Sequence, residues 1–143
     1  MLEITRQADY ALRAVLEVSR LPKGERAPTA IIATRQNIPL PFLAKIVSQL
    51  AVKGILEATR GASGGVSLAR APKDITLKEV IEAIDGPITL NRCTRDPDAC
   101  DLSPGCPIHL IFTDTQQLLV DKLSNTTFAD MVQRAGELEQ AAL

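Results

Sequence analysis

The stretch that decides the fold runs from residue 28 to residue 70 and reads PTAIIATRQNIPLPFLAKIVSQLAVKGILEATRGASGGVSLAR. Pro28 can start a short helix, and the Asn-Ile-Pro sequence at 37–39 interrupts it with turn-forming residues. A second helix follows at once, because Pro41 suits a first helical position and Gly54 suits the C-terminal end. Two short helices joined by a tight turn predict a helix-turn-helix.

Two strand-forming segments follow the second helix of this pair. Residues 55–60 and 66–70 are predicted to form a hairpin around the glycine-rich turn at 61–65. Glycine supplies positive φ angles there and lets the backbone approach its neighbour closely. A phosphate-binding loop does not fit, because the turn joins two strands and lacks the Gly-Lys-Ser/Thr ending. The hairpin therefore predicts a wing beside the helix-turn-helix.

Further helices are expected on both sides of this unit. Apolar residues at helical spacing predict a first helix over residues 4–21, and a capping box at Thr76 starts another. Pro107 begins a long helix to about Ser124, and Thr127 caps a last helix whose Ala-rich end is expected to fray. The predicted fold class is mostly α with a small β-hairpin wing: a winged helix-turn-helix plus a long dimerisation helix.

The long helix carries an apolar stripe that includes Ile111, Leu118 and Leu123. This stripe could dock on the chain's own core or on the same helix of a second subunit. We favour a homodimer, because a dyad places two recognition helices on the two halves of a palindromic operator in double-stranded DNA.

Charge is divided unevenly along the chain. Residues 1–73 hold eleven Lys and Arg against five Asp and Glu, whereas residues 74–143 hold five against twelve. A basic front half suggests a polyanion partner, and an acidic rear half argues against nucleic acid coating the whole chain. Both halves could also simply be solvated surface.

The rear half contains all three cysteines and the single histidine within seventeen residues: Cys93, Cys100, Cys106 and His109. Turn-forming residues between them let a short segment wrap thiolates around a soft metal or an iron-sulfur cluster. The thiols could instead be small core residues, or a disulfide with one thiol left over. We favour metal or cluster binding because the loop is polar and offers no core for the thiols. The lack of a secretory or membrane-spanning segment also predicts a cytoplasmic location, where thiols stay reduced and disulfides are rare.

These patterns predict two regions within one continuous domain. Residues 1–73 form the winged helix-turn-helix DNA-binding region, and residues 74–143 hold the cluster-binding loop and the dimerisation helices. An enzyme is not expected, because no nucleophile has a paired base in the sequence pattern and no phosphate loop is found.

The residues expected to contact DNA lie on the second helix of the pair, just ahead of it, and in the wing. Each of them alone is more often a solvated surface residue, and only their placement on helix and wing favours contact. The expected set is Arg35, Lys45, Ser48, Gln49, Arg60, Gly64 and Gly65.

Over nearly its whole length the chain resembles the IscR-like (Rrf-two) family of bacterial winged-helix transcription regulators. The most specific matches are TRQADYALR at 5–13, IPLPFL at 38–43, RGASGG at 60–65 and the three cysteines. Members with those cysteines are similar in binding an iron-sulfur cluster (2Fe-2S or 4Fe-4S) and using its state to alter DNA binding. The resemblance therefore implies that the three cysteines bind iron.

The resemblance offers two candidates for the fourth ligand. His109 occupies the position of the non-thiolate ligand in the namesake branch, whereas Asp9 matches a carboxylate that serves across the dimer in the nitric-oxide-sensing branch. We favour His109, because its spacing is local. The chain departs from the namesake branch in a longer first cysteine interval, and in Pro39, Pro41 and Ala44, where that branch often has polar or acidic side chains.

The leading prediction is a dimeric DNA-binding transcription regulator that senses iron-sulfur status, redox state or nitric oxide. The alternative is a metal- or iron-sulfur-binding protein whose helix-turn-helix serves protein contacts only. The basic wing argues against that alternative.

Overall fold

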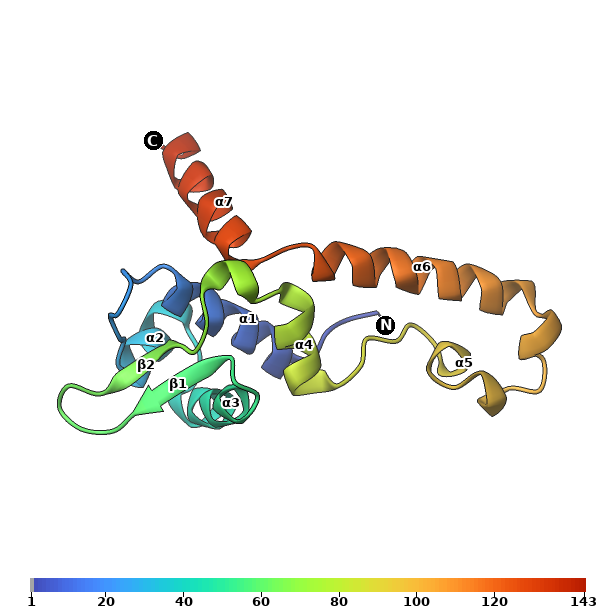
Figure 1. Ribbon diagram of the computed structural model, residues 1–143, viewed down its shortest axis with the longest axis horizontal. Coiled ribbons are helices and arrows are strands. Elements are labelled where there is room, and N and C mark those ends of the chain that lie inside the picture. Colours follow the sequence, from blue (N-terminus) through green and yellow to red (C-terminus); the bar gives the residue numbers. More distant parts are fainter. Residues whose placement is uncertain (1) are drawn as a thin grey trace.

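The computed structural model describes residues 2–143 as a mostly helical chain with one two-stranded antiparallel sheet (Figure 1). The helices are α1 (Arg6–Ser19), α2 (Thr29–Gln36), α3 (Leu40–Val52), α4 (Leu77–Asp85), α5 (Arg92–Arg95), α6 (Pro107–Ser124) and α7 (Phe128–Ala141). The strands are β1 (Leu56–Thr59) and β2 (Gly65–Leu68), and short 3-10 turns lie at η1 (Pro72–Asp74), η2 (Pro97–Ala99) and η3 (Ser103–Gly105). The predicted fold class is confirmed.

Two local features differ from the expectation. Helix α5 and the 3-10 turns are not predicted from the sequence, because they are too short to show a helical repeat of apolar residues. The last helix runs to Ala141 instead of fraying after Glu137, because Leu, Glu, Gln and Ala are all strong helix formers.

Threonine side chains set the start of three helices. Each accepts a hydrogen bond of 3.1–3.2 Å from the backbone N–H three residues later; they are Thr5, Thr76 and Thr127. The Asp130 carboxylate accepts a hydrogen bond in return from the Thr127 N–H at 2.9 Å, which holds the pKa of Asp130 below its ordinary value. At Thr76 the expected reciprocal bond is not formed, and the Glu79 carboxylate pairs with Arg70 instead.

One hydrophobic core joins the helix-turn-helix to segments far along the chain. Val80 of α4 and Phe128 of α7 are buried in the same cluster as Val15 of α1 and Leu43 of α3. The Phe128 N–H also donates to the carbonyl of Ile75 at 2.9 Å, which fixes the start of α7 beside α4. Residues on both sides of position 73 therefore share this core.

The wing is a regular hairpin anchored to the loop before α2. The two strands pair with Leu56 opposite Leu68, and Val66 bridges to Ala27 through two backbone hydrogen bonds of 3.0 and 2.7 Å. The loop at Ala27 therefore lies as a third backbone segment along one edge of the hairpin. The turn of the hairpin extends away from the lobe (Figure 1).

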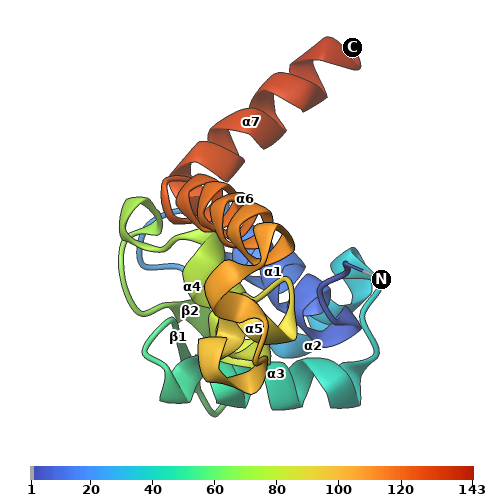
Figure 2. The same ribbon diagram turned by 90° about the vertical axis from the view of Figure 1, so that its right-hand side faces the viewer.

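The α6 helix projects from the winged-helix lobe, and α5 lies beside its outer end (Figures 1 and 2). None of its 18 residues is buried, and its large exposed apolar side chains are Ile108, Leu110, Ile111, Leu118 and Leu119. Among residues 2–143, no helix combines the length and the apolar character that a membrane crossing requires.

Candidate DNA-binding surface and cysteine segment

The α3 helix lies along the lower edge of the winged-helix lobe in both views (Figures 1 and 2). Its core-facing side is held by Leu43, Ile46 and Leu50, which are buried at helical spacing. Lys45 and Ser48 lie on the other side and are exposed. The structure thus leaves these two polar side chains free to reach a partner.

Of two other residues of the expected DNA-binding set, Gln49 is partly enclosed by the protein and Arg35 is paired within it. Gln49 is half-buried, and its Oε1 atom is enclosed without a hydrogen-bond partner. The Arg35 guanidinium donates to the Glu17 carboxylate of α1 at 3.1 Å, and Gln36 donates to the same carboxylate at 2.8 Å. The Arg35 side chain stays 59% exposed, so its remaining N–H groups can still reach a phosphate.

Gly64 and Gly65 of the wing lie where the backbone has no room for a side chain. A Cβ atom on Gly64 would lie 2.1 Å from the carbonyl oxygen of Thr59, and one on Gly65 would lie 2.8 Å from that of Ala27. Gly65 also has a φ of +147°, which side-chain-bearing residues rarely adopt. These glycines therefore allow the close backbone approach that the sequence predicts, while Arg60 is exposed where the hairpin turn begins.

Arg13 forms a junction that the sequence analysis misses. Its guanidinium donates to Asp9 at 2.7 Å and to the carbonyl of Gln36 at 2.9 Å, and it stacks on the Tyr10 ring at 4.9 Å from the centroid. The junction ties α1 to the end of α2, and the spacing of Asp9 and Arg13 by four residues is the signal that could have revealed it.

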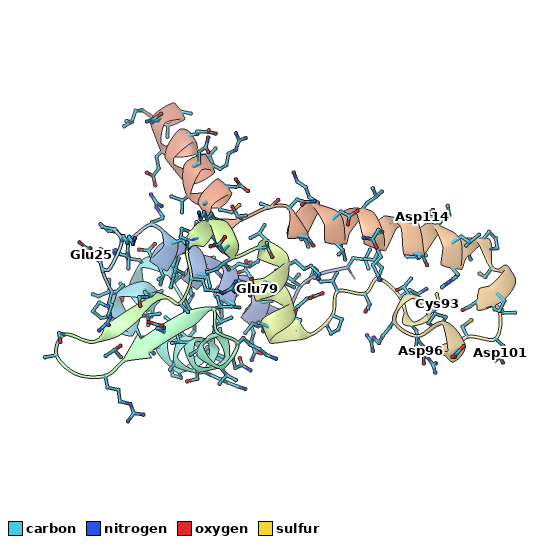
Figure 3. All side chains as sticks on the ribbon, viewed as in Figure 1. Glu25, Glu79, Cys93, Asp96, Asp101 and Asp114 are labelled. Atoms are coloured by element: carbon cyan, nitrogen blue, oxygen red, sulfur yellow. The ribbon has the colours of Figure 1, made fainter. Side chains whose placement is uncertain are left out.

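The three cysteines lie along one segment at the outer end of α6. Cys93 is buried in α5, whereas Cys100 and Cys106 are half-buried at the ends of η2 and η3. All three thiols are free. Figure 3 places Cys93 at this end of the molecule together with the carboxylates of Asp96 and Asp101.

Local hydrogen bonds shape this cysteine segment. The side chains of Asn91 and Thr94 cap α5 reciprocally, and Asp96 accepts from the Asp98 N–H at 3.1 Å to start η2. The Leu90 N–H donates to Gln116 Oε1 in the middle of α6 at 2.9 Å. The segment is therefore built from polar caps and held against α6.

The thiols share a segment but are not gathered around one point. Among residues 2–143, no group of three or more His, Cys, Asp or Glu side chains is arranged to hold a metal ion. Two polar atoms in the segment are nevertheless buried without hydrogen-bond partners: Ser103 Oγ and His109 Nδ1. Because buried polar atoms nearly always have a partner, the His109 nitrogen fits a ligand role, as does the chemistry of three thiols and one imidazole.

Comparisons with known proteins agree with this architecture. A family model described as an iron-dependent transcriptional regulator, Rrf2, matches residues 4–134. An Rrf2-like HTH-type transcriptional regulator of Rhodobacter capsulatus is 34% identical over 138 residues, covering 90% of this chain and 91% of the relative. The HTH-type transcriptional regulator IscR of Pectobacterium carotovorum is 29% identical over 140 residues, covering 98% of this chain and 85% of the relative.

A solved structure shows the same fold. CymR, the global cysteine regulator of B. subtilis, superposes with a TM-score of 0.80 at 24% identity, covering 94% of this chain and 98% of that one. The family match spans the helix-turn-helix, the wing, the cysteine segment and α6 in one alignment. The chain therefore belongs to the Rrf2 family of transcriptional regulators.

Proposed function

We propose that this protein is a dimeric DNA-binding regulator whose activity depends on an iron-sulfur cluster held by Cys93, Cys100, Cys106 and His109. The observation that carries the proposal is the set of three free thiols and one unpartnered buried imidazole nitrogen in a single segment. When bound, such a cluster supplies one-electron redox chemistry and sensitivity to oxidant or nitric oxide.

The structure favours His109 over Asp9 as the non-thiolate ligand. His109 lies in the first turn of α6, one turn after Cys106, whereas Asp9 already pairs with Arg13. Asp9 also belongs to α1 in the winged-helix lobe, while the cysteine segment lies at the outer end of α6 (Figure 1). Asp9 could therefore be the fourth ligand of the cluster only if it came from a partner subunit.

Dimerisation would account for the exposed apolar side chains of α6. An 18-residue helix without a buried residue leaves Ile111 and Leu118 in water, which an isolated chain rarely tolerates for a whole helix. Pairing this helix with its copy would cover them and would place two α3 helices on a palindromic operator. Residues 1–73 would then bind DNA, and residues 74–143 would dimerise and hold the cluster.

A regulator that works through its thiols without a cluster is the second candidate. It is favoured by the observation that the three free thiols are not arranged as a metal-binding group among residues 2–143. Iron and acid-labile sulfide analysis of anaerobically purified protein, with its absorption spectrum, separates the two. Bound iron and sulfide support the cluster, and their absence after anaerobic reconstitution would leave the thiol mechanism. We expect catalytic activity in neither case.

The DNA-binding surface makes a prediction about salt. Lys45→Ala and Arg60→Ala should each weaken operator binding and reduce the slope of log affinity against log salt by about two, because each variant of the dimer loses two phosphate-directed cations, one per subunit. Fluorescence anisotropy with an operator selected from genomic DNA measures both quantities. Arg134→Ala is the matched control, since Arg134 is an exposed arginine on α7. Unchanged affinity and slope in both test variants would remove this surface from the DNA interface.

The fourth ligand makes a second prediction. His109→Ala should change the absorption spectrum of the anaerobic protein and shorten the lifetime of its chromophore in air, because one iron would lose its protein ligand. Asp9→Ala should behave like the unchanged protein in both measurements. The opposite result would assign the ligand to Asp9 of the partner subunit, and two unchanged spectra would exclude both residues.

A further inference from the structure

The first two turns of α3 expose apolar side chains where a recognition helix usually presents polar ones. Leu40 is 48% exposed and Phe42 is 51% exposed, and Ala44 is exposed on the same short stretch. These residues lie between and just after Pro39 and Pro41, which hold the start of the helix. Leu40 and Ala44, four residues apart, lie on one side of the helix, and Phe42 lies toward its other side. Together these three residues form the apolar tip, which is solvent-exposed and is not part of the core.

Helix α3 has few polar side chains that could form hydrogen bonds with bases. The helix contains neither Asp nor Glu, so it offers no carboxylate to accept a hydrogen bond from the amino group of cytosine. Its one amide side chain, Gln49, has its oxygen buried, so it is poorly placed for the paired hydrogen bonds that identify adenine. Lys45 and Ser48 are the remaining exposed polar side chains.

The position of the apolar tip indicates its partner. The N-terminal residues of the second helix in a helix-turn-helix lie against base edges in the major groove. Lys45 is exposed next to the tip, and Arg60 is exposed in the wing, so the surroundings are basic and suit a polyanion. The one strongly apolar group on base edges in the major groove is the 5-methyl group of thymine.

We propose that Leu40, Phe42 and Ala44 recognise thymine 5-methyl groups in each operator half-site. The proposal rests on the DNA-binding function above and specifies what that surface recognises. Apolar contact with the methyl group distinguishes thymine from cytosine at a position where α3 has no hydrogen-bonding alternative. The half-site is therefore identified through its thymines, and Lys45 supplies the neighbouring polar or phosphate contact.

The test replaces thymine by deoxyuridine in the selected operator, which removes the 5-methyl group and leaves base pairing unchanged. Each contacted methyl should be worth about a four-fold loss of affinity, as expected for burial of one methyl-sized group. Anisotropy titrations at fixed salt should show this loss at one or two thymines per half-site, and no loss for thymines outside the half-sites.

Protein variants then connect the methyl groups to the apolar tip. Leu40→Ala and Phe42→Ala should bind the thymine operator more weakly, and their preference for thymine over deoxyuridine should shrink toward one. Val52→Ala is the matched control, because Val52 is 86% exposed at the opposite end of α3. Circular dichroism melting checks that each variant is folded. We expect that all are, because the replaced side chains are exposed.

The outcomes separate this proposal from the function on which it rests. Tight operator binding with equal affinity for thymine and deoxyuridine would overturn methyl recognition and leave DNA binding intact. Undiminished DNA binding by the Leu40→Ala, Phe42→Ala double variant would also overturn it and would assign the apolar tip to a protein partner. Failure of the unchanged protein to bind any DNA would instead overturn the proposed function.

Discussion

We expect anaerobically purified protein to carry the brown chromophore of the proposed cluster, and we expect replacement of Cys100 or Cys106 by Ala to abolish it and to remove nearly all bound iron and sulfide. Each thiolate would supply one of three strong bonds to iron, and a methyl group cannot ligate a metal. The chain contains only three cysteines, so no fourth thiol can take the place of the one removed. Iron and sulfide assays with the absorption spectrum measure the loss.

Folding should survive these substitutions, because both thiols are only half-buried and lie outside the main core. Cys93 should give the same loss of iron, but it is buried, so Cys93→Ala also removes packing around α5. Ser103→Ala is the matched control: it alters a buried side chain of the same segment that is not a proposed ligand. A full iron and sulfide complement in all three cysteine variants would show that the ligand assignment is wrong.

Phe128→Ala is expected to destabilise the folded protein by about 3–5 kcal/mol, a large part of the net stability of a domain this size. Phe128 is among the largest fully buried side chains, at 1% exposure. It anchors the start of α7 in the core that α1, α3 and α4 share. Its loss would leave a cavity where the chain after α6 returns to the winged-helix lobe.

Urea denaturation at one fixed protein concentration measures this effect, because dimerisation would make stability depend on concentration. Leu138→Ala is the matched control on the same helix, since Leu138 is 60% exposed and its truncation should change the free energy of unfolding by less than about 0.5 kcal/mol. Equal destabilisation by the two variants would show that α7 does not depend on its Phe128 anchor.

Local sequence signals determined most of the secondary structure. Asn37 adopts a φ of +52° at the end of α2, and Pro41 lies in the first turn of α3, so the tight turn between these helices follows from backbone chemistry alone. The same holds for the helix that Thr127 caps and for Gly64, which lies against Thr59 within the hairpin turn. These features depend on neighbours within a few residues, which a sequence displays directly.

The candidate site was only partly visible in the sequence. The spacing of the cysteines revealed the segment, and the four-residue spacing of Asp9 and Arg13 could have revealed their pair, but the buried Nδ1 of His109 could not be foreseen. The same is true of Arg35, which sequence position assigns to DNA and the fold brings to Glu17. Such partners depend on how α1, α2 and α6 are placed in space.

The sequence by itself determined the order of the longer helices, the wing and the clustering of the thiols, because each depends on local composition and spacing, and its motifs carried the resemblance to the family. Only the tertiary structure decided that Phe128 joins the core of the N-terminal half, that no residue of α6 is fully buried, and that the start of α3 exposes Leu40 and Phe42. Burial depends on contacts between segments far apart in the chain, and helical periodicity does not specify which faces those contacts cover.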